Sequence, residues 1–439
     1  MNIETFKEII LNFQKESLPE FTPRSLEIQE IANMSIAITG VRRAGKTYRT
    51  FQYIHTLLKN GVSPENICRI QFNDFRLRGL TSDGLSGIEA AYYSLYPDKQ
   101  KTDVVYYIFD EIHRISGWEE FILYLLDTPR KKVLITGSTS KLLTGDIASA
   151  LRGKNFSLVQ FPFSFAEFIR YYKVDNDTVS SNGKAYVRSM MNRYLKQGGF
   201  PGLLSLPDNM HVPLLQNYTE TMLLKDIIEA HSDDHININT FSDFYQALIA
   251  RTACPMTVNK IAVTLKKKES KFSNETLYRY LDYLKESFML YTVEFYSNSE
   301  KIRLANYRKI YSIDWALADA IAPGSGIDIT RRFENLIFIE LLRRGYKPYY
   351  FKTKEGFEID FVITMKSSDS GKTMLIQCCY SLADEDVRER EIRAITKSAE
   401  FLKSEKNLII TMDSDEVITE NKTIIHIIPA WKWLLSEKD

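Results

Sequence analysis

The sequence predicts an α/β protein: a parallel sheet with helices on both faces, followed by a helical region and a small α/β domain. Short and nearly unbroken apolar runs alternate with helical patterns up to residue 161, as expected when both faces of each strand are covered. The pattern becomes mostly helical after Phe165, and strands return after Asp328. The expected strands of the first sheet are Met34–Thr39, Ile67–Phe72, Val104–Phe109, Lys132–Thr136 and Ser157–Phe161.

The composition is that of a globular chain. Its 439 residues are 44% hydrophobic and 26% charged, and this length suits roughly two to four domains. A net charge of +1 is too small to attract the protein as a whole to nucleic acid or to an anionic membrane. The four cysteines have no zinc-site spacing, which favours a reduced protein. No apolar run spans a bilayer and no signal peptide is visible, so we expect a cytoplasmic protein without a membrane partner.

We expect three domains along the chain. Residues 1–170 hold the parallel sheet, residues 171–325 hold a helical lid and a winged-helix region, and residues 326–439 hold the small α/β domain. The winged helix is expected from an order of helix, helix, strand and strand, which the sequence places at Thr257–Leu265, Ser273–Ser287, Met289–Tyr296 and Lys309–Ile313.

A glycine-rich segment follows the first expected strand: Gly40-Val41-Arg42-Arg43-Ala44-Gly45-Lys46-Thr47. It fits the P-loop (Walker A) pattern, and a helical pattern follows it. Such a bend turns successive backbone N–H groups toward a phosphate at a helix N-terminus. Lys46 would reach the β- and γ-phosphates of ATP, and the Thr47 hydroxyl would hold Mg²⁺. The alternative is an ordinary glycine turn.

The third expected strand ends in two acids, Asp110 and Glu111, as a Walker B strand does. Asp110 would hold the Mg²⁺ shell, and Glu111 would orient and polarise the attacking water. The alternative is a pair of solvated acids. The fourth strand ends in small polar residues, of which Ser138 or Thr139 could act as a sensor of the γ-phosphate. A hydroxyl-rich helix cap is the other explanation of these residues.

Several longer strings accompany these motifs and resemble a family. They are Phe109-Asp110-Glu111-Ile112-His113-Arg114-Ile115-Ser116-Gly117-Trp118-Glu119, Ile135–Leu143, Ala150-Leu151-Arg152-Gly153, Phe161-Pro162-Phe163-Ser164-Phe165-Ala166-Glu167-Phe168 and Gly198-Gly199-Phe200-Pro201. Together they are similar to prokaryotic AAA-superfamily P-loop ATPases with a C-terminal domain of unknown function, over nearly the whole chain. The resemblance implies a P-loop NTPase fold, ATP and Mg²⁺.

One departure from the family lies two residues after Arg152. The family often has Arg where this chain has Lys154. Arg152 could act as an arginine finger toward a γ-phosphate, in cis or from a neighbouring subunit. A structural ion pair is an equal alternative, and Lys154 cannot offer the same bidentate fork. The oligomeric state is not indicated by the sequence.

The C-terminal region resembles the core of PD-(D/E)xK nucleases, a restriction-endonuclease-like fold. A helix with Glu334 precedes a strand with Glu358 and Asp360, and a second strand follows a hairpin turn at 367–372. Gln377 and Cys379 stand where such a nuclease needs Glu and Lys to hold Mg²⁺ and support the water. We therefore expect a nuclease-like fold without nuclease activity, which leaves DNA binding or protein contact as its role.

The basic side chains near the second winged helix offer a second hypothesis. They are Lys266, Lys267, Lys268, Lys271, Arg279 and Lys285. A basic face there would bind duplex DNA, whereas a solvated charge run would only cover a lid. The first hypothesis is thus an ATP-hydrolysing or ATP-switched protein with a possible protein client. The alternatives are a nucleotide-regulated DNA-binding protein and an active nuclease.

Overall fold

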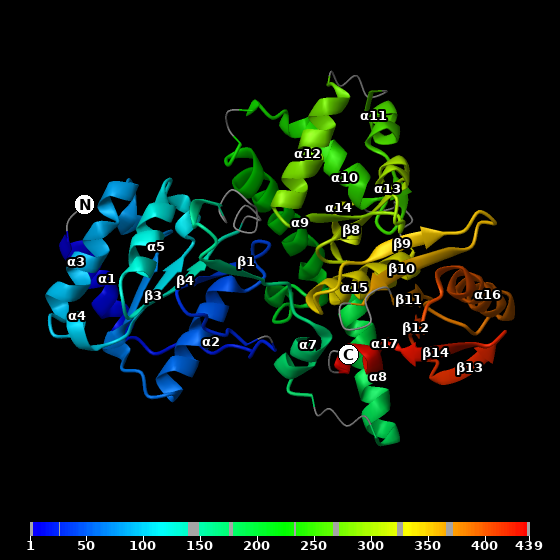
Figure 1. Ribbon diagram of the computed structural model, residues 1–439, viewed down its shortest axis with the longest axis horizontal. Helices are drawn as coiled ribbons and strands as arrows, with labels where there is room; N and C mark the ends of the chain where they lie inside the picture. The colour runs from blue at the N-terminus through cyan, green and yellow to red at the C-terminus, as the bar shows by residue number, and fades with distance from the viewer. Residues whose placement is uncertain are drawn as a thin grey trace. The chain divides into compact units, whose positions relative to one another are not determined.

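The computed structural model describes residues 3–25, 27–138, 149–174, 179–231, 234–266, 272–322, 328–365 and 372–436. The chain forms two compact units, residues 1–161 and 162–439 (Figure 1). A division into domains at residues 170 and 325 stays a prediction. The predicted hairpin turn at 367–372 lies almost wholly outside the described residues.

The described part of unit 1 contains a five-stranded, fully parallel sheet with the strand order β2-β3-β4-β1-β5. The α/β fold that the sequence predicts is therefore confirmed. The strands are β1 (Ser35–Thr39), β2 (Ile67–Gln71), β3 (Val105–Asp110), β4 (Lys131–Thr136) and β5 (Asn155–Val159). The helices are α1 (Ile3–Lys15), α2 (Lys46–Lys59), α3 (Ser86–Leu95), α4 (Lys99–Thr102) and α5 (Trp118–Asp127).

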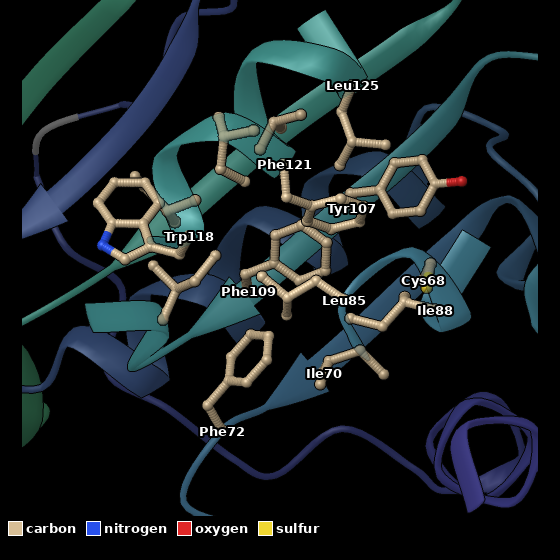
Figure 2. Packing of buried hydrophobic residues seen from close by; sticks show 14 of the residues in the cluster. Cys68, Ile70, Phe72, Leu85, Ile88, Tyr107, Phe109, Trp118, Phe121 and Leu125 are labelled. Carbon is tan, nitrogen blue, oxygen red and sulfur yellow. The ribbon is translucent and has the colours of Figure 1, made fainter. Parts of the chain in front are cut away.

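Helices cover both faces of this sheet because its strands are apolar on both faces. Alternate side chains of a strand point to opposite faces. Tyr107 and Phe109 of β3 pack with α1, α3 and α5, and Figure 2 shows Phe109 between Phe72 and Phe121. Ile108, between them in the sequence, packs on the other face in the cluster that includes α2.

The strand order brings three loops together at one edge. β4 lies between β3 and β1, so the segments that follow β1, β3 and β4 leave the sheet side by side. Parallel α/β sheets bind ligands at this carboxyl edge, where the strand order reverses.

Unit 2 begins with helices and a small sheet. The two expected helices and two expected strands are observed, with one further helix between the strands, and a short strand completes the three-stranded antiparallel sheet β6-β8-β7. Whether this part is a winged helix stays a prediction. The elements are α7 (Phe165–Tyr171), α8 (Ser181–Gln197), α9 (His211–Thr221), the π-helix η8 (Met222–Ile228), α10 (Ile238–Ile249), β6 (Pro255–Met256), α11 (Val258–Lys266), α12 (Asn274–Glu286), β7 (Leu290–Val293), α13 (Glu300–Ala305), β8 (Arg308–Ser312) and α14 (Leu317–Ile321).

A six-stranded mixed sheet forms the rest of unit 2, with the order β13-β14-β12-β11-β10-β9. Helix α15 precedes it, and α16 packs against β10, β11 and β14. The elements are α15 (Ile329–Arg343), β9 (Tyr349–Lys352), β10 (Glu358–Thr364), β11 (Thr373–Cys378), α16 (Glu385–Leu402), β12 (Lys406–Thr411), β13 (Glu416–Glu420), β14 (Thr423–Pro429) and α17 (Ala430–Leu435).

A buried carboxylate holds the Gly198-Gly199-Phe200-Pro201 break in unit 2. The Gly199 N–H donates to Asp314 Oδ2 over 2.7 Å, and the Ala316 N–H donates to Oδ1 over 2.9 Å. Asp314 is completely buried. Burial raises its pKa to about 6, although the backbone hydrogen bonds act to lower it.

The free energy of unfolding should therefore fall as the pH rises from about 4 to about 6. Asp314 ionises near pH 4 in an unfolded chain but keeps its proton to about pH 6 in the fold. The folded state binds more protons across this window, so rising pH destabilises it, by at most about 3 kcal/mol. Urea unfolding of Asp314→Asn should lose this part of the pH dependence. A variant that keeps the wild-type pH dependence would contradict the assignment to Asp314.

Candidate functional site

The glycine-rich loop is shaped by its backbone. It leaves β1, which is buried over all five residues, and ends where α2 begins at Lys46. Gly40 and Gly45 have φ values of +135° and +96°, and Gly45 is the left-handed N-cap of α2. A Cβ on Gly40 would stand 2.3 Å from the carbonyl oxygen of Gln160. Only glycine fits at position 40, because both the space and the backbone angle exclude a side chain.

Arg24 braces the loop from a segment that precedes the sheet. Its buried guanidinium donates through Nη2 to the carbonyl oxygen of Ala44 and, over 2.8 Å, to that of Phe161. One side chain thus joins the middle of the loop to the last residue of unit 1.

Lys46 is buried at the start of α2. Its Nζ donates to the carbonyl oxygens of Gly40 and Val41 over 2.9 and 3.0 Å. Val41 and Ala44 are buried, Arg42, Gly45 and Thr47 are partly buried, and Arg43 is exposed. The ammonium therefore lies folded back against the loop that the sequence predicts to bind phosphate.

Asp110 is completely buried at the end of β3. Its Oδ1 accepts a hydrogen bond from Thr136 Oγ1 over 2.6 Å, and its Oδ2 lies 3.2 Å from Nη2 of Arg69. Arg69 comes from the neighbouring strand β2, and its guanidinium lies over the Phe51 ring at 4.6 Å. Asp110 is thus held in one orientation from both adjacent strands.

Glu111 follows in a left-handed conformation, with φ of +60°. Its N–H donates to Thr136 Oγ1 over 3.0 Å, and its Oε1 accepts from Ser138 Oγ over 3.2 Å. The other carboxylate oxygen lies 3.5 Å from His113 Nε2.

The charges around Glu111 keep it ionised. Burial acts to raise the pKa of Glu111, but the positive charge of Lys46 acts against it. His113, Arg42 and the Ser138 hydrogen bond lower it further, so the pKa lies below its usual value. The structure therefore brings Lys46, Glu111 and Ser138 into one electrostatic cluster at the edge of the sheet.

Other predicted site residues are placed differently. Thr139 lies outside the described residues. Arg152 is exposed, with φ of +49°, and its side chain makes no hydrogen bond or ion pair with the described part of the chain. The neighbouring Lys154 pairs with Asp127. An ion pair thus involves Lys154 rather than Arg152, whose role as a finger stays a prediction.

Sequence reasoning assigned no role to Arg69, Thr136 or His113, which all contact the two acids. One signal was available for Arg69, since a charged residue inside the apolar strand Ile67–Gln71 must have a buried partner.

The acids of the C-terminal region gather around a lysine. Glu334, Glu358 and Asp360 all lie within 3.1 Å of Lys309 Nζ. Gln377 accepts from the Asp360 N–H and donates to Glu391, while Cys379 donates to the carbonyl oxygen of Ser381. In the part of the chain that the structure describes, no three His, Cys, Asp or Glu side chains form a group able to hold a metal ion.

The basic cluster is described only in part. Lys267, Lys268 and Lys271 lie outside the described residues. Arg279 lies 3.8 Å from Asp234, and Lys285 pairs with Asp282 over 2.9 Å. Binding of duplex DNA by this cluster stays a prediction.

Models of known protein domains match most of the chain. Residues 32–169 match the model of an AAA domain, and residues 188–328 and 330–433 match models of two domains of unknown function (DUF8612 and DUF4143). An uncharacterized protein of Methanocaldococcus jannaschii is 32% identical over 445 residues, covering 98% of this chain and 95% of that protein. The chain belongs to the same family as that protein.

A second relative is an uncharacterized protein of Haemophilus influenzae, 30% identical over 74% of this chain and 78% of that protein. Within this family, the present chain carries an AAA-type P-loop domain, most of which lies in unit 1. The Walker-type ATPase PABY2304 of Pyrococcus abyssi has a TM-score of 0.42 and 16% identity, covering 73% of this chain and 95% of that one. The Aeropyrum pernix ORC1 protein, solved in complex with DNA, has a TM-score of 0.28 and 10% identity, covering 73% and 90%. Both TM-scores are low, so the site rests on this chain's own residues.

No helix among the described residues is long and apolar enough to cross a bilayer.

Proposed function

We propose that the protein binds ATP with Mg²⁺ at the loop Gly40–Thr47, hydrolyses it, and uses the bound nucleotide as a conformational switch. The observation that carries this proposal is the convergence of Lys46, Glu111 and Ser138 at the carboxyl edge of the sheet. Lys46 supplies a cation at the N-terminus of α2, Glu111 supplies an ionised base, and Ser138 supplies a hydroxyl. Phosphoryl transfer needs groups of these kinds.

The loop supplies the phosphate site. Its positive φ angles at Gly40, Arg43 and Gly45 permit successive N–H groups to face an anion. Lys46 satisfies its ammonium with loop carbonyl oxygens, and a phosphate group would replace these partners with charged ones. Charge-assisted hydrogen bonds are about twice as strong as neutral ones, which favours this exchange.

Asp110 and Thr47 are the residues that would hold a Mg²⁺ ion. Asp110 offers a carboxylate at the edge of the sheet, and Thr47 offers a hydroxyl at the start of α2. Mg²⁺ is typically bound by one or two such groups together with phosphate oxygens and waters. When bound, the ion would neutralise charge on the β- and γ-phosphates.

Glu111 is the general base of the proposed reaction. Its ionised carboxylate can accept a proton from a water, and Ser138 and the Thr136 contact fix its orientation. Lys46 stabilises the charge that develops on the phosphate oxygens.

The proposed switch acts through Arg24. This side chain bonds both the loop at Ala44 and the end of unit 1 at Phe161. If nucleotide binding changes the conformation of the loop, it would also change the hydrogen bond between Arg24 and Ala44. Arg24 would pass this change to Phe161, after which unit 2 begins.

Replacement of Lys46 tests the nucleotide site. Lys46→Ala should weaken ATP binding by about 2–3 kcal/mol, or roughly 30–150-fold, because a charge-assisted contact to phosphate is lost. Titration calorimetry with ATP and Mg²⁺ measures this. Lys59→Ala, an exposed lysine at the other end of α2, is the matched control and should bind as the wild type does. Equal affinities of Lys46→Ala and the wild type would contradict the proposal.

A further inference from the structure

A buried ammonium lies between β8, α15 and β10 in unit 2. Lys309, on β8, is 1% exposed. Its Nζ lies 2.9 Å from Glu358 Oε1, and 3.1 Å from both Glu334 Oε1 and Asp360 Oδ1. One cation from the three-stranded sheet thus meets three carboxylates from α15 and β10, which belong to the C-terminal part.

The carboxylates are held in place by other bonds. Tyr311 donates its hydroxyl to Glu334 Oε1 over 2.6 Å, and the Cys378 N–H donates to Asp360 Oδ2 over 3.0 Å. Glu358 Oε2 also lies 3.5 Å from Lys352 Nζ. These contacts would keep the carboxylates turned inward if the ammonium were removed.

In this centre the single Lys309 ammonium faces three carboxylates. Burial acts to lower the pKa of Lys309, but Glu334, Asp360 and Glu358 outweigh it, so the pKa lies well above its usual value. Burial, and then the charge of Asp360, raise the pKa of Glu334 to about 7. Lys309 is therefore charged, and the centre has more carboxylates than cations.

The half-exposed Lys352 ammonium contacts only the Glu358 carboxylate among the three, and the buried groups that face the centre add no positive charge. Tyr311, Cys254 and Cys378 face it, and burial raises the pKa of each. The Tyr350 ring lies 5.9 Å from Lys309 Nζ. The positive charge of Arg331 acts on Cys254, but within the described part of the chain Arg331 makes no ion pair with the three carboxylates.

The centre can be reached from solvent. The Glu358 side chain is 30% exposed, whereas those of Lys309, Asp360 and Glu334 are 2%, 10% and 13% exposed. Three carboxylates at an opening to solvent are ligands that hard divalent cations accept. The ammonium occupies the space between them, and with it in place the described side chains form no group able to hold a metal ion.

We propose that the Lys309 ammonium is the resident cation of the Glu334, Glu358 and Asp360 centre and excludes divalent metal ions from it. The chain itself thereby supplies the cation of this centre, which fastens β8 to α15 and β10 without a metal. This inference does not depend on the proposed ATPase function.

The test measures Mn²⁺ binding to the full chain without nucleotide, by loss of the electron paramagnetic resonance signal of free Mn²⁺. The wild type should bind no Mn²⁺ at this centre. Lys309→Met keeps much of the side-chain volume but removes the charge, and should bind about one Mn²⁺ per chain, at least roughly tenfold more tightly than the wild type. Lys309→Arg keeps the charge and is the matched control, which should bind none.

Removal of a ligand makes the result specific to the centre. Lys309→Met combined with Asp360→Asn should lose the Mn²⁺ site. Wild-type Mn²⁺ binding that disappears in Asp360→Asn would overturn the proposal, as would a folded Lys309→Met variant that binds no Mn²⁺.

Folding provides a second readout. If Lys309→Met does not fold in EDTA, circular dichroism should show that Mn²⁺ restores the fold, since the metal replaces the missing charge. Failure of Mn²⁺ to restore it would contradict the proposal.

Discussion

Glu111→Gln should bind ATP as tightly as the wild type and hydrolyse it about 10²–10⁴-fold more slowly. Gln has nearly the same shape and can keep the hydrogen bond that Ser138 makes to Glu111. It cannot accept a proton from water, so only the chemical step is lost. Steady-state phosphate release and calorimetric ATP binding, measured on the same preparation, separate the two effects.

The control for this variant is Glu120→Gln. Glu120 is exposed in the first turn of α5, close in sequence to Glu111 but outside the cluster. It should leave both binding and turnover unchanged. If Glu111→Gln hydrolyses ATP as fast as the wild type, the assignment of Glu111 as the base is wrong.

Gly198→Ala should destabilise unit 2 by about 3–5 kcal/mol. Gly198 has φ of +86° and ψ of −177°, a conformation essentially limited to glycine. A Cβ there would stand 2.4 Å from Asp314 Oδ1. That carboxylate cannot move aside without breaking its hydrogen bonds to Gly199 and Ala316.

Gly345→Ala is the matched control. Gly345 has a similar φ of +83°, but a Cβ there would meet nothing within 4 Å. It should cost only about 1 kcal/mol, because the positive φ is strained for alanine but no steric clash is added. Urea unfolding followed by tryptophan fluorescence reports mainly on unit 2, where Trp315, Trp431 and Trp433 lie. Equal losses in the two variants would show that Asp314 does not confine Gly198.

The sequence predicted the elements of unit 1 well because their signals are local. The strands β1–β4 are buried on both faces, or nearly so, and their apolar runs are visible without knowledge of the fold, whereas the edge strand β5 is only partly buried. Elements with weaker patterns were missed. β13 is an edge strand with exposed and acidic residues, and its partner β14 and helix α17 were not predicted either. Within the region predicted to be mostly helical, α9 ends at Thr221 and the chain continues as the π-helix η8, which hydrophobic periodicity does not distinguish from an α-helix.

The sequence likewise indicated some residues of the candidate site and not others. Gly40–Thr47 and Asp110-Glu111 are contiguous motifs, so the sequence alone indicates them. The partners of Asp110 come from neighbouring strands, and their contacts depend on a strand order that the sequence does not state. Lys309 is 51 residues from Asp360, and nothing in either segment indicates that they meet.

The most direct test of the account is release of phosphate from ATP by the wild-type chain, measured with Mg²⁺, with EDTA, and beside Lys46→Ala. Phosphate release by the wild type should require Mg²⁺ and should be lost in Lys46→Ala. A wild-type chain that binds ATP but releases no phosphate with Mg²⁺ would contradict it, and so would equal release by Lys46→Ala.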